Sequence, residues 1–246
     1  MFKDKDTVLK RIVEDSKKIS CSKRLRVGVY CGKGVSAGHL WHAYPLENLK
    51  ITIVFFTEKD IKSLKDMDVI CFPSGGGYAR YIKKSDQEYL KKIIHNQGIG
   101  YLGTCGGNVF GNDMGLLDAK LIKSGDKYPY ALQVNGFPGI KVIRKNHPAM
   151  INEHEIIYPF YYFGQVFDNT SGPDVTVLAR YKDFNNCFYF KGGKYKAKPG
   201  EIMIDLPVLL QAGTGKDGSF YQGCIRKLAK RSCLLSGSTF YPKEKF

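Results

Sequence analysis

The chain has 246 residues, of which 43% are hydrophobic and 13% aromatic, enough for a substantial core in one large domain. No apolar run reaches about eighteen residues, and the charged residues 1–6 lack the apolar stretch of a secretory signal, so we expect neither a membrane span nor secretion. The net charge is +15, but the basic residues are dispersed along the chain, which argues against nucleic acid as a partner. A small anionic or carboxylate-bearing ligand is compatible with this charge.

The seven cysteines are scattered, with no CxxC pair and no spacing typical of zinc ligands. An odd, irregular set in a chain of this length favours reduced thiols and a cytoplasmic location. We therefore expect no metal site, and no motif in the sequence calls for a cofactor.

The first half of the chain alternates predicted helices and strands. Apolar residues recur at helical spacing in residues 6–19, which predicts an amphipathic helix within an N-terminal extension, residues 1–24. Strands are predicted at 26–30, 51–56, 69–72 and 99–104, and helices at 61–64 and 84–96, the second ending at Gly98. This alternation predicts a parallel sheet with helices on both faces, whose ligands bind beyond the carboxyl ends of the strands.

The pattern changes after about residue 118, where strand-like runs dominate. These runs are 140–143, 156–158, 161–163, 175–178 and 187–190, separated by glycines and prolines. They predict β-hairpins and long loops added to the same domain. Because no Pro/Ser-rich linker separates the halves, we assign residues 25–246 to one domain.

A strand-to-turn-to-helix motif surrounds Cys105. The segment 103–107, Gly-Thr-Cys-Gly-Gly, follows an apolar run and precedes a helix-compatible stretch. This is the layout of a nucleophile elbow, with Cys where a hydrolase carries Ser. The glycines permit a strained turn, and the start of the following helix favours the thiolate. The alternative is a tight turn with an incidental cysteine.

Three consecutive glycines, Gly75, Gly76 and Gly77, follow the strand predicted at 69–72. The backbone N–H groups of such a loop can approach a ligand closely. Beside a nucleophilic Cys105 they predict an oxyanion hole, with the amides of Gly76 and Gly106 as donors. A flexible surface loop is the alternative.

Several segments occur together in a characteristic order: 71–77, 100–107, 146–149, 161–167, 175–181 and 233–238. In this order they resemble the biotin-protein ligase N-terminal-domain-like family of the class I glutamine amidotransferase-like superfamily, over roughly residues 25 to 242. The resemblance implies a flavodoxin-like three-layer α/β sandwich with a mostly parallel central sheet and β-rich additions in the C-terminal half. It also implies that Cys105 is the nucleophile and that Gly75 to Gly77 lie near the oxyanion.

The sequence departs from this pattern near its end. Active amidotransferases of the superfamily carry a Phe-His-Pro-Glu segment after the last strand, but here Tyr241 stands where the His is expected. A phenol with a pKa of about 10 is a poor base for a thiol at pH 7. Tyr241 is therefore grouped with the substrate-binding candidates. The chain also lacks a biotin-ligase catalytic module.

Three histidines elsewhere in the chain are candidates for activating Cys105 in place of the missing catalytic His. His39 and His42 follow the first strand in a predicted loop, at the sheet edge that carries Cys105. They are either a base or ligand contact, or a pair of solvated loop residues. His147 lies in a His-Pro turn, where capping the turn is the favoured alternative.

Three functions are compatible with these residues. The first is a cysteine-dependent hydrolase or amidotransferase-like enzyme acting on a small amide-type or carboxylate-bearing substrate. The second is a non-catalytic ligand-binding or regulatory protein on the same scaffold, motivated by Tyr241. The third is a redox or electrophile sensor that uses a low-pKa Cys105. The N-terminal helix could cover the sheet or mediate a homodimer.

Overall fold

The computed structural model describes residues 25–35, 38–48, 51–122, 134–147, 150, 153–162, 166–172, 175–189 and 203–212. The helix predicted at 6–19 and the candidate Tyr241 lie outside these residues. Within the described ranges, no helix is both long and apolar enough to cross a membrane.

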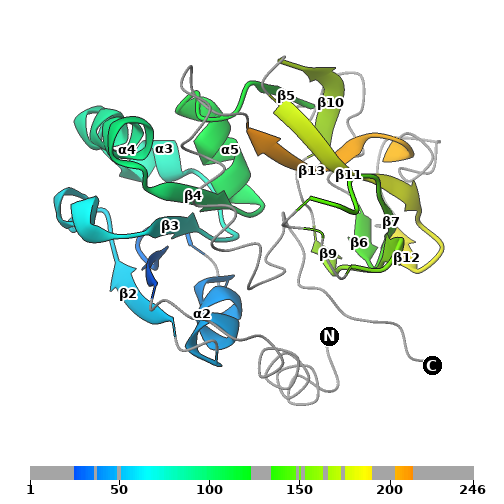
Figure 1. Cartoon of the computed structure of the whole chain (residues 1–246), viewed down its shortest axis with the longest axis horizontal. Coiled ribbons are helices and arrows are strands. Elements are labelled where there is room, and N and C mark those ends of the chain that lie inside the picture. The colour runs from blue at the N-terminus through cyan, green and yellow to red at the C-terminus, as the bar shows by residue number, and fades with distance from the viewer. Residues whose placement is uncertain are drawn as a thin grey trace.

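A four-stranded parallel sheet forms the centre of the first half (Figure 1). Its strands are β1 (Arg26–Tyr30), β2 (Thr52–Phe56), β3 (Val69–Phe72) and β4 (Gly100–Gly103), in the order β2-β1-β3-β4. All three pairings are parallel, which confirms the four predicted strands. The carboxyl ends of β1, β3 and β4 therefore meet at one edge of the sheet.

Side chains alternate between the two faces of this sheet, as the period of a strand requires. Val27 and Val29 of β1 pack on one face with Leu46, whereas Tyr30 of the same strand packs on the other with Phe110. The first face is covered by α2 (Gly38–Asn48). The second is covered by η1 (Ile61–Asp66), α3 (Tyr78–Tyr81), α4 (Lys84–Gln97) and α5 (Gly106–Asp113).

Helix α2 corrects the prediction of a loop after β1. Its sequence holds Gly38 and Pro45, two of the residues least favourable in helices, so local propensity disfavours this helix. Burial of Leu46 and Ala43 against the sheet accompanies the helical conformation. Tertiary packing thus overrides propensity in this segment. By contrast, α4 forms as predicted and ends at Gly98 in the left-handed conformation, with φ 84°.

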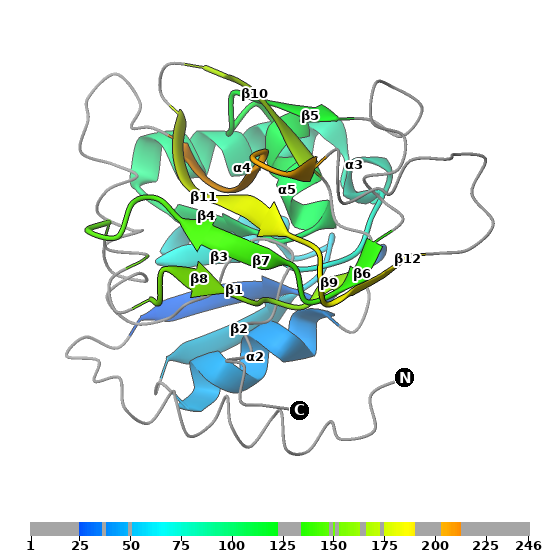
Figure 2. The ribbon, with the colours of Figure 1, turned by 90° about the vertical axis from the view of Figure 1, so that its right-hand side faces the viewer.

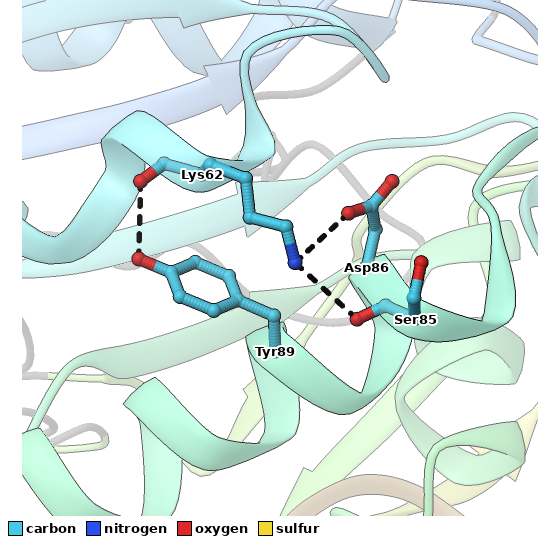
Figure 3. A network of polar contacts seen from close by, with 4 residues as sticks. All are labelled: Lys62, Ser85, Asp86 and Tyr89. Carbon is cyan, nitrogen blue, oxygen red and sulfur yellow. Dashed lines mark hydrogen bonds and ion pairs between the residues drawn. The ribbon is translucent and has the colours of Figure 1, made fainter.

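A polar network joins η1 to α4 on the outer surface (Figure 3). The Lys62 ammonium lies 3.0 Å from the Asp86 carboxylate, donates to the Ser85 carbonyl and sits 4.3 Å from the centre of the Tyr89 ring. The Tyr89 hydroxyl donates in turn to the Lys62 carbonyl at 3.0 Å. Because the Lys62 side chain is 58% exposed, this network orients the two helices and adds little stability.

The second half consists of antiparallel strands beside the parallel sheet (Figures 1 and 2). One sheet pairs β5 (Ala119–Ile122) with β10 (Val166–Ser171). A second sheet has the order β13 (Pro207–Ala212), β11 (Val175–Asp183), β7 (Gly139–Val142), β8 (Ile156–Ile157). A third sheet has the order β12 (Cys187–Tyr189), β6 (Val134–Gly136), β9 (Tyr161–Tyr162). Together they enclose a core of their own, around Val134, Leu178 and Met203. The five predicted runs are confirmed as β7, β8, β9, β11 and β12, while β5, β6, β10 and β13 were not predicted.

Candidate functional site

Cys105 occupies a strained turn between β4 and α5. Its φ of 52° and ψ of −115° place it in a region that side chains rarely adopt. Among the described non-glycine residues, it shares positive φ only with Asp205. Strand β4 ends two residues before Cys105 and α5 begins immediately after it. This is the backbone course of a nucleophile elbow.

The elbow packs directly on the backbone that follows β3. A Cβ atom added to Gly106 would collide with the carbonyl of Gly75, and one added to Gly107 would collide with the carbonyl of Phe72. Neither carbonyl belongs to a flexible side chain, so only glycine fits at these two positions. The glycines therefore bring the turn and the loop after β3 into contact.

The triple-glycine loop presents one backbone amide to Cys105, and α5 presents another. Hydrogen bonds from the backbone of Gly75 and Gly106 reach the thiol and favour its charged form. The Gly76 amide, expected to be a donor at this site, instead donates to the Gly34 carbonyl at 2.9 Å. Gly75 thus has the position expected of Gly76, while Gly77 is the N-cap of α3.

The pKa of the Cys105 thiol is nevertheless raised above its ordinary value. Burial is the largest cause, and the two backbone hydrogen bonds oppose it only in part. The prediction that the start of the helix would leave Cys105 as a thiolate is therefore wrong for this state of the protein. A sensor role that depends on a low-pKa thiol loses its support.

A network of side chains fixes the loop that bridges to Gly75. The Tyr30 hydroxyl donates to the carboxylate of Glu58 at 3.2 Å and to the Lys33 carbonyl at 3.0 Å. The Lys33 amide donates to the same carboxylate at 3.2 Å. One residue further on, Gly34 accepts the Gly76 amide, so this network supports the geometry of the glycine loop.

His42 lies behind the elbow, on the buried side of α2. Its Nε2 is 2.9 Å from the Thr104 hydroxyl, and its Nδ1 has no hydrogen-bond partner in the part of the chain that the structure describes. Burial lowers the pKa of His42 to about 4, so the imidazole is neutral at pH 7. His42 therefore contacts the residue before Cys105 and is not a solvated loop histidine.

The other two candidate histidines are placed differently. His39 is half-buried on α2, with its ring edge-on to Phe55 at 6.3 Å. His147 lines an open hollow of about 790 Å³ beside the end of β7, together with Lys141 and Arg144. No residue of the elbow lines this hollow.

Three buried tyrosines near Cys105 were not predicted as functional residues. Burial raises the pKa of Tyr78, Tyr161 and Tyr181, and a charge on Cys105 raises each further. The Tyr78 hydroxyl donates to the Pro73 carbonyl at 3.0 Å, which fixes the start of the glycine loop. These phenols stay neutral at pH 7, and the Tyr161 hydroxyl donates to that of Tyr181. Tyr161 belongs to the run 161–163, which the sequence predicted only as a strand.

Metal chemistry has no ligand set in the part of the chain that the structure describes. No group of three or more His, Cys, Asp or Glu residues is arranged to hold an ion there. The described cysteines, Cys31, Cys71, Cys105 and Cys187, are all free thiols.

Comparison with known proteins identifies the scaffold. No family model and no curated protein matches the sequence. A candidate GMP synthase component from Thermoplasma acidophilum has a similar structure, with TM-score 0.50 and 13% identity over 84% of this chain and 93% of that one. A candidate ThuA-like protein from Bacteroides uniformis is also similar, with TM-score 0.50 and 12% identity over 87% of this chain and 91% of that one.

The chain has a glutamine amidotransferase-like, flavodoxin-like fold. At these identities the likeness concerns the fold alone, since one fold supports many activities. It agrees with the α/β architecture expected from the sequence.

Proposed function

We propose that this protein is a cysteine-dependent hydrolase or amidotransferase-like enzyme, with Cys105 as the nucleophile. The observation that carries the proposal is the strained φ of 52° at Cys105, combined with two backbone amides at its sulfur. Strain of about 1–3 kcal/mol persists in a fold only where the surroundings impose it, and such residues cluster at active sites. A merely structural turn at this position would be more stable with glycine.

The chemistry would be acyl transfer from a small amide-type or carboxylate-bearing substrate. The thiol sulfur bonds to the carbonyl carbon, and the carbonyl electron pair moves to oxygen, where the amides of Gly75 and Gly106 donate hydrogen bonds. The carbonyl then re-forms and the C–N bond breaks with its electron pair on nitrogen, which takes the thiol proton and leaves as an amine or ammonia. Water then hydrolyses the thioester, which releases the acid and restores the thiol.

The surroundings of Cys105 suit a neutral substrate group. Tyr161 and Tyr181 come from the antiparallel half, and the Tyr161 hydroxyl donates to that of Tyr181, so the neutral Tyr181 phenol is the one that can donate to a carbonyl or a leaving group. In this proposal the protein is related to the biotin-protein ligase N-terminal-domain-like family, and Tyr241 contacts the substrate. The protein works in a reducing, cytoplasmic compartment. A homodimer is compatible with this proposal.

A second candidate is a non-catalytic ligand-binding or regulatory protein. Two observations favour it: burial raises the pKa of the Cys105 thiol, and His42 directs its Nε2 to Thr104. In the described residues, no base is hydrogen-bonded to Cys105. The protein would then bind its ligand at the elbow without turnover.

Acylation by p-nitrophenyl acetate distinguishes the two candidates. An enzyme with Cys105 as nucleophile should release about one equivalent of p-nitrophenolate per protein in a burst, because the acyl-enzyme accumulates. Peptide mass spectrometry should find the acetyl group on Cys105. The variant Cys105→Ala should lose the burst, and the matched control Cys31→Ala, which removes another free thiol, should keep it.

Absence of a burst in the wild type would contradict the enzyme proposal and favour the ligand-binding candidate. A burst of equal size in Cys105→Ala would contradict Cys105 as the nucleophile. Both variants need a cooperative thermal transition like that of the wild type for these comparisons.

A further inference from the structure

His42 and Thr104 form a polar pair inside an apolar layer. His42 is 7% exposed and Thr104 is 4% exposed. Tyrosines and cysteines aside, they are two of the three described polar residues that are buried, and their side chains are 2.9 Å apart. A hydrogen bond sequestered in this way is stronger than one exposed to water, and losing one partner leaves the other unsatisfied.

The unpartnered nitrogen fixes the direction of this hydrogen bond. His42 Nδ1 is buried and has no hydrogen-bond partner among the described residues. A buried N–H group without an acceptor is rarer and costlier than an acceptor without a donor. The proton therefore resides on Nε2, which donates to the Thr104 hydroxyl oxygen.

Thr104 is held from several sides. Its amide donates to the Phe72 carbonyl at 3.0 Å, and its carbonyl accepts the Gly107 amide at 2.9 Å. Its side chain is held by His42. The next residue, Cys105, has the strained φ of 52°, so movement of Thr104 would let the strained turn relax.

We propose that His42 is a positioning residue, which holds Thr104 and thereby the turn that directs the Cys105 sulfur to the backbone amides of Gly75 and Gly106. It acts as a neutral hydrogen-bond donor and neither takes nor gives a proton in the reaction. This inference rests on the proposed role of Cys105 as a nucleophile and assigns a function to a histidine that does not contact it.

The test follows the alkylation of Cys105 by iodoacetamide from pH 6 to pH 10, by peptide mass spectrometry. In His42→Ala the turn should relax away from the amides, which favour the thiolate. The apparent pKa of Cys105 should then rise, and alkylation at pH 8 should slow about fivefold, the ratio expected for one buried hydrogen bond. His42→Gln, whose amide can donate from a similar position, should restore most of the rate.

Two further variants separate positioning from a general loss of stability. Thr104→Val removes the acceptor and leaves His42 in place, so its profile should shift as that of His42→Ala does. His95→Gln, a matched control on the exposed face of α4, should keep the wild-type profile. Thermal melts show which variants are folded, and Thr104→Val provides the test if His42→Ala is not.

An unchanged Cys105 profile in folded Thr104→Val would overturn the inference. Equal loss in His42→Gln and His42→Ala, at equal stability, would overturn it as well, because the hydrogen bond would then be irrelevant. Alkylation requires no turnover. The two proposals can therefore fail separately. If the wild type gives no p-nitrophenolate burst but the alkylation profile of Cys105 shifts in the variants, the positioning role is upheld and the enzyme proposal is contradicted.

Discussion

Glycine should stabilise the protein relative to alanine at Cys105, although glycine is usually the more destabilising of the two. Both substitutions remove the thiol. Alanine keeps a Cβ atom and with it the strain at φ 52° and ψ −115°, whereas glycine adopts this conformation freely. The comparison of Cys105→Gly with Cys105→Ala therefore isolates the strain from the chemistry of the sulfur.

The expected difference follows from opposing contributions. Relief of the strain favours glycine by about 1–3 kcal/mol. The greater freedom of glycine in the unfolded chain opposes this by about 0.5–1 kcal/mol. Loss of one partly buried methyl group opposes it by at most about 0.8 kcal/mol. These contributions allow a net difference between about −0.8 and +2.5 kcal/mol, so the free energy of unfolding should favour glycine by about 1 kcal/mol, near the middle of that range.

Urea denaturation followed by circular dichroism measures this difference, provided that the slopes of the transitions agree. Cys71 is the matched control, because it lies fully buried in the interior of β3 with extended backbone. There glycine should be less stable than alanine by about 1–2 kcal/mol, since no strain is relieved. If glycine is less stable than alanine by as much at Cys105 as at Cys71, the turn at Cys105 is not strained and the main support for a nucleophile is lost.

Further predictions concern the rest of the scaffold. Gly107→Ala should destabilise the fold by about 3 kcal/mol or more in urea denaturation, because its Cβ would collide with a carbonyl of β3. The matched control Gly76→Ala should cost less than about 1 kcal/mol, because no atom lies within 4 Å of the Cβ that it adds. Lowering the pH from 7 to 5 should reduce the free energy of unfolding by about 2 kcal/mol through His42. The pKa of His42 is about 4 in the folded protein and about 6.5 in the unfolded chain, so over this range of pH only the unfolded chain takes up the proton. The His42→Gln variant should lack this slope, and an equal slope in the variant would refute the assignment. Tyr89→Phe should lower stability by about 0.5 kcal/mol, since its bond to the Lys62 carbonyl is exposed, and a loss above about 2 kcal/mol would show that the network is a main support of α4.

Local patterns were sufficient to predict the parallel sheet. Short apolar runs marked β1 to β4, and helical spacing together with Gly98 marked α4 and its end. The elbow motif at Cys105 also predicted its own turn, because glycines at fixed positions restrict how closely the backbone packs. These features depend on residues that are near one another in the chain.

Helix α2 and the role of its histidines could not be predicted in this way. The sequence of α2 has weak helical propensity, and its conformation depends on packing against the sheet. His42 meets Thr104 across 62 positions of the chain, so spacing in the sequence gave no sign of the pair.

The sequence by itself determined the α/β class, the positions of β1 to β4 and of α4 along the chain, and the position of a candidate nucleophile. Only the tertiary structure decided the protonation of the groups around it. Burial raises the pKa of the Cys105 thiol and lowers that of His42, and burial is a property of the whole fold. The tertiary structure also assigned the Gly76 amide to Gly34 and gave Gly75 the place beside the thiol, because the bridge between the loops after β1 and β3 forms only when both strands pair in the sheet.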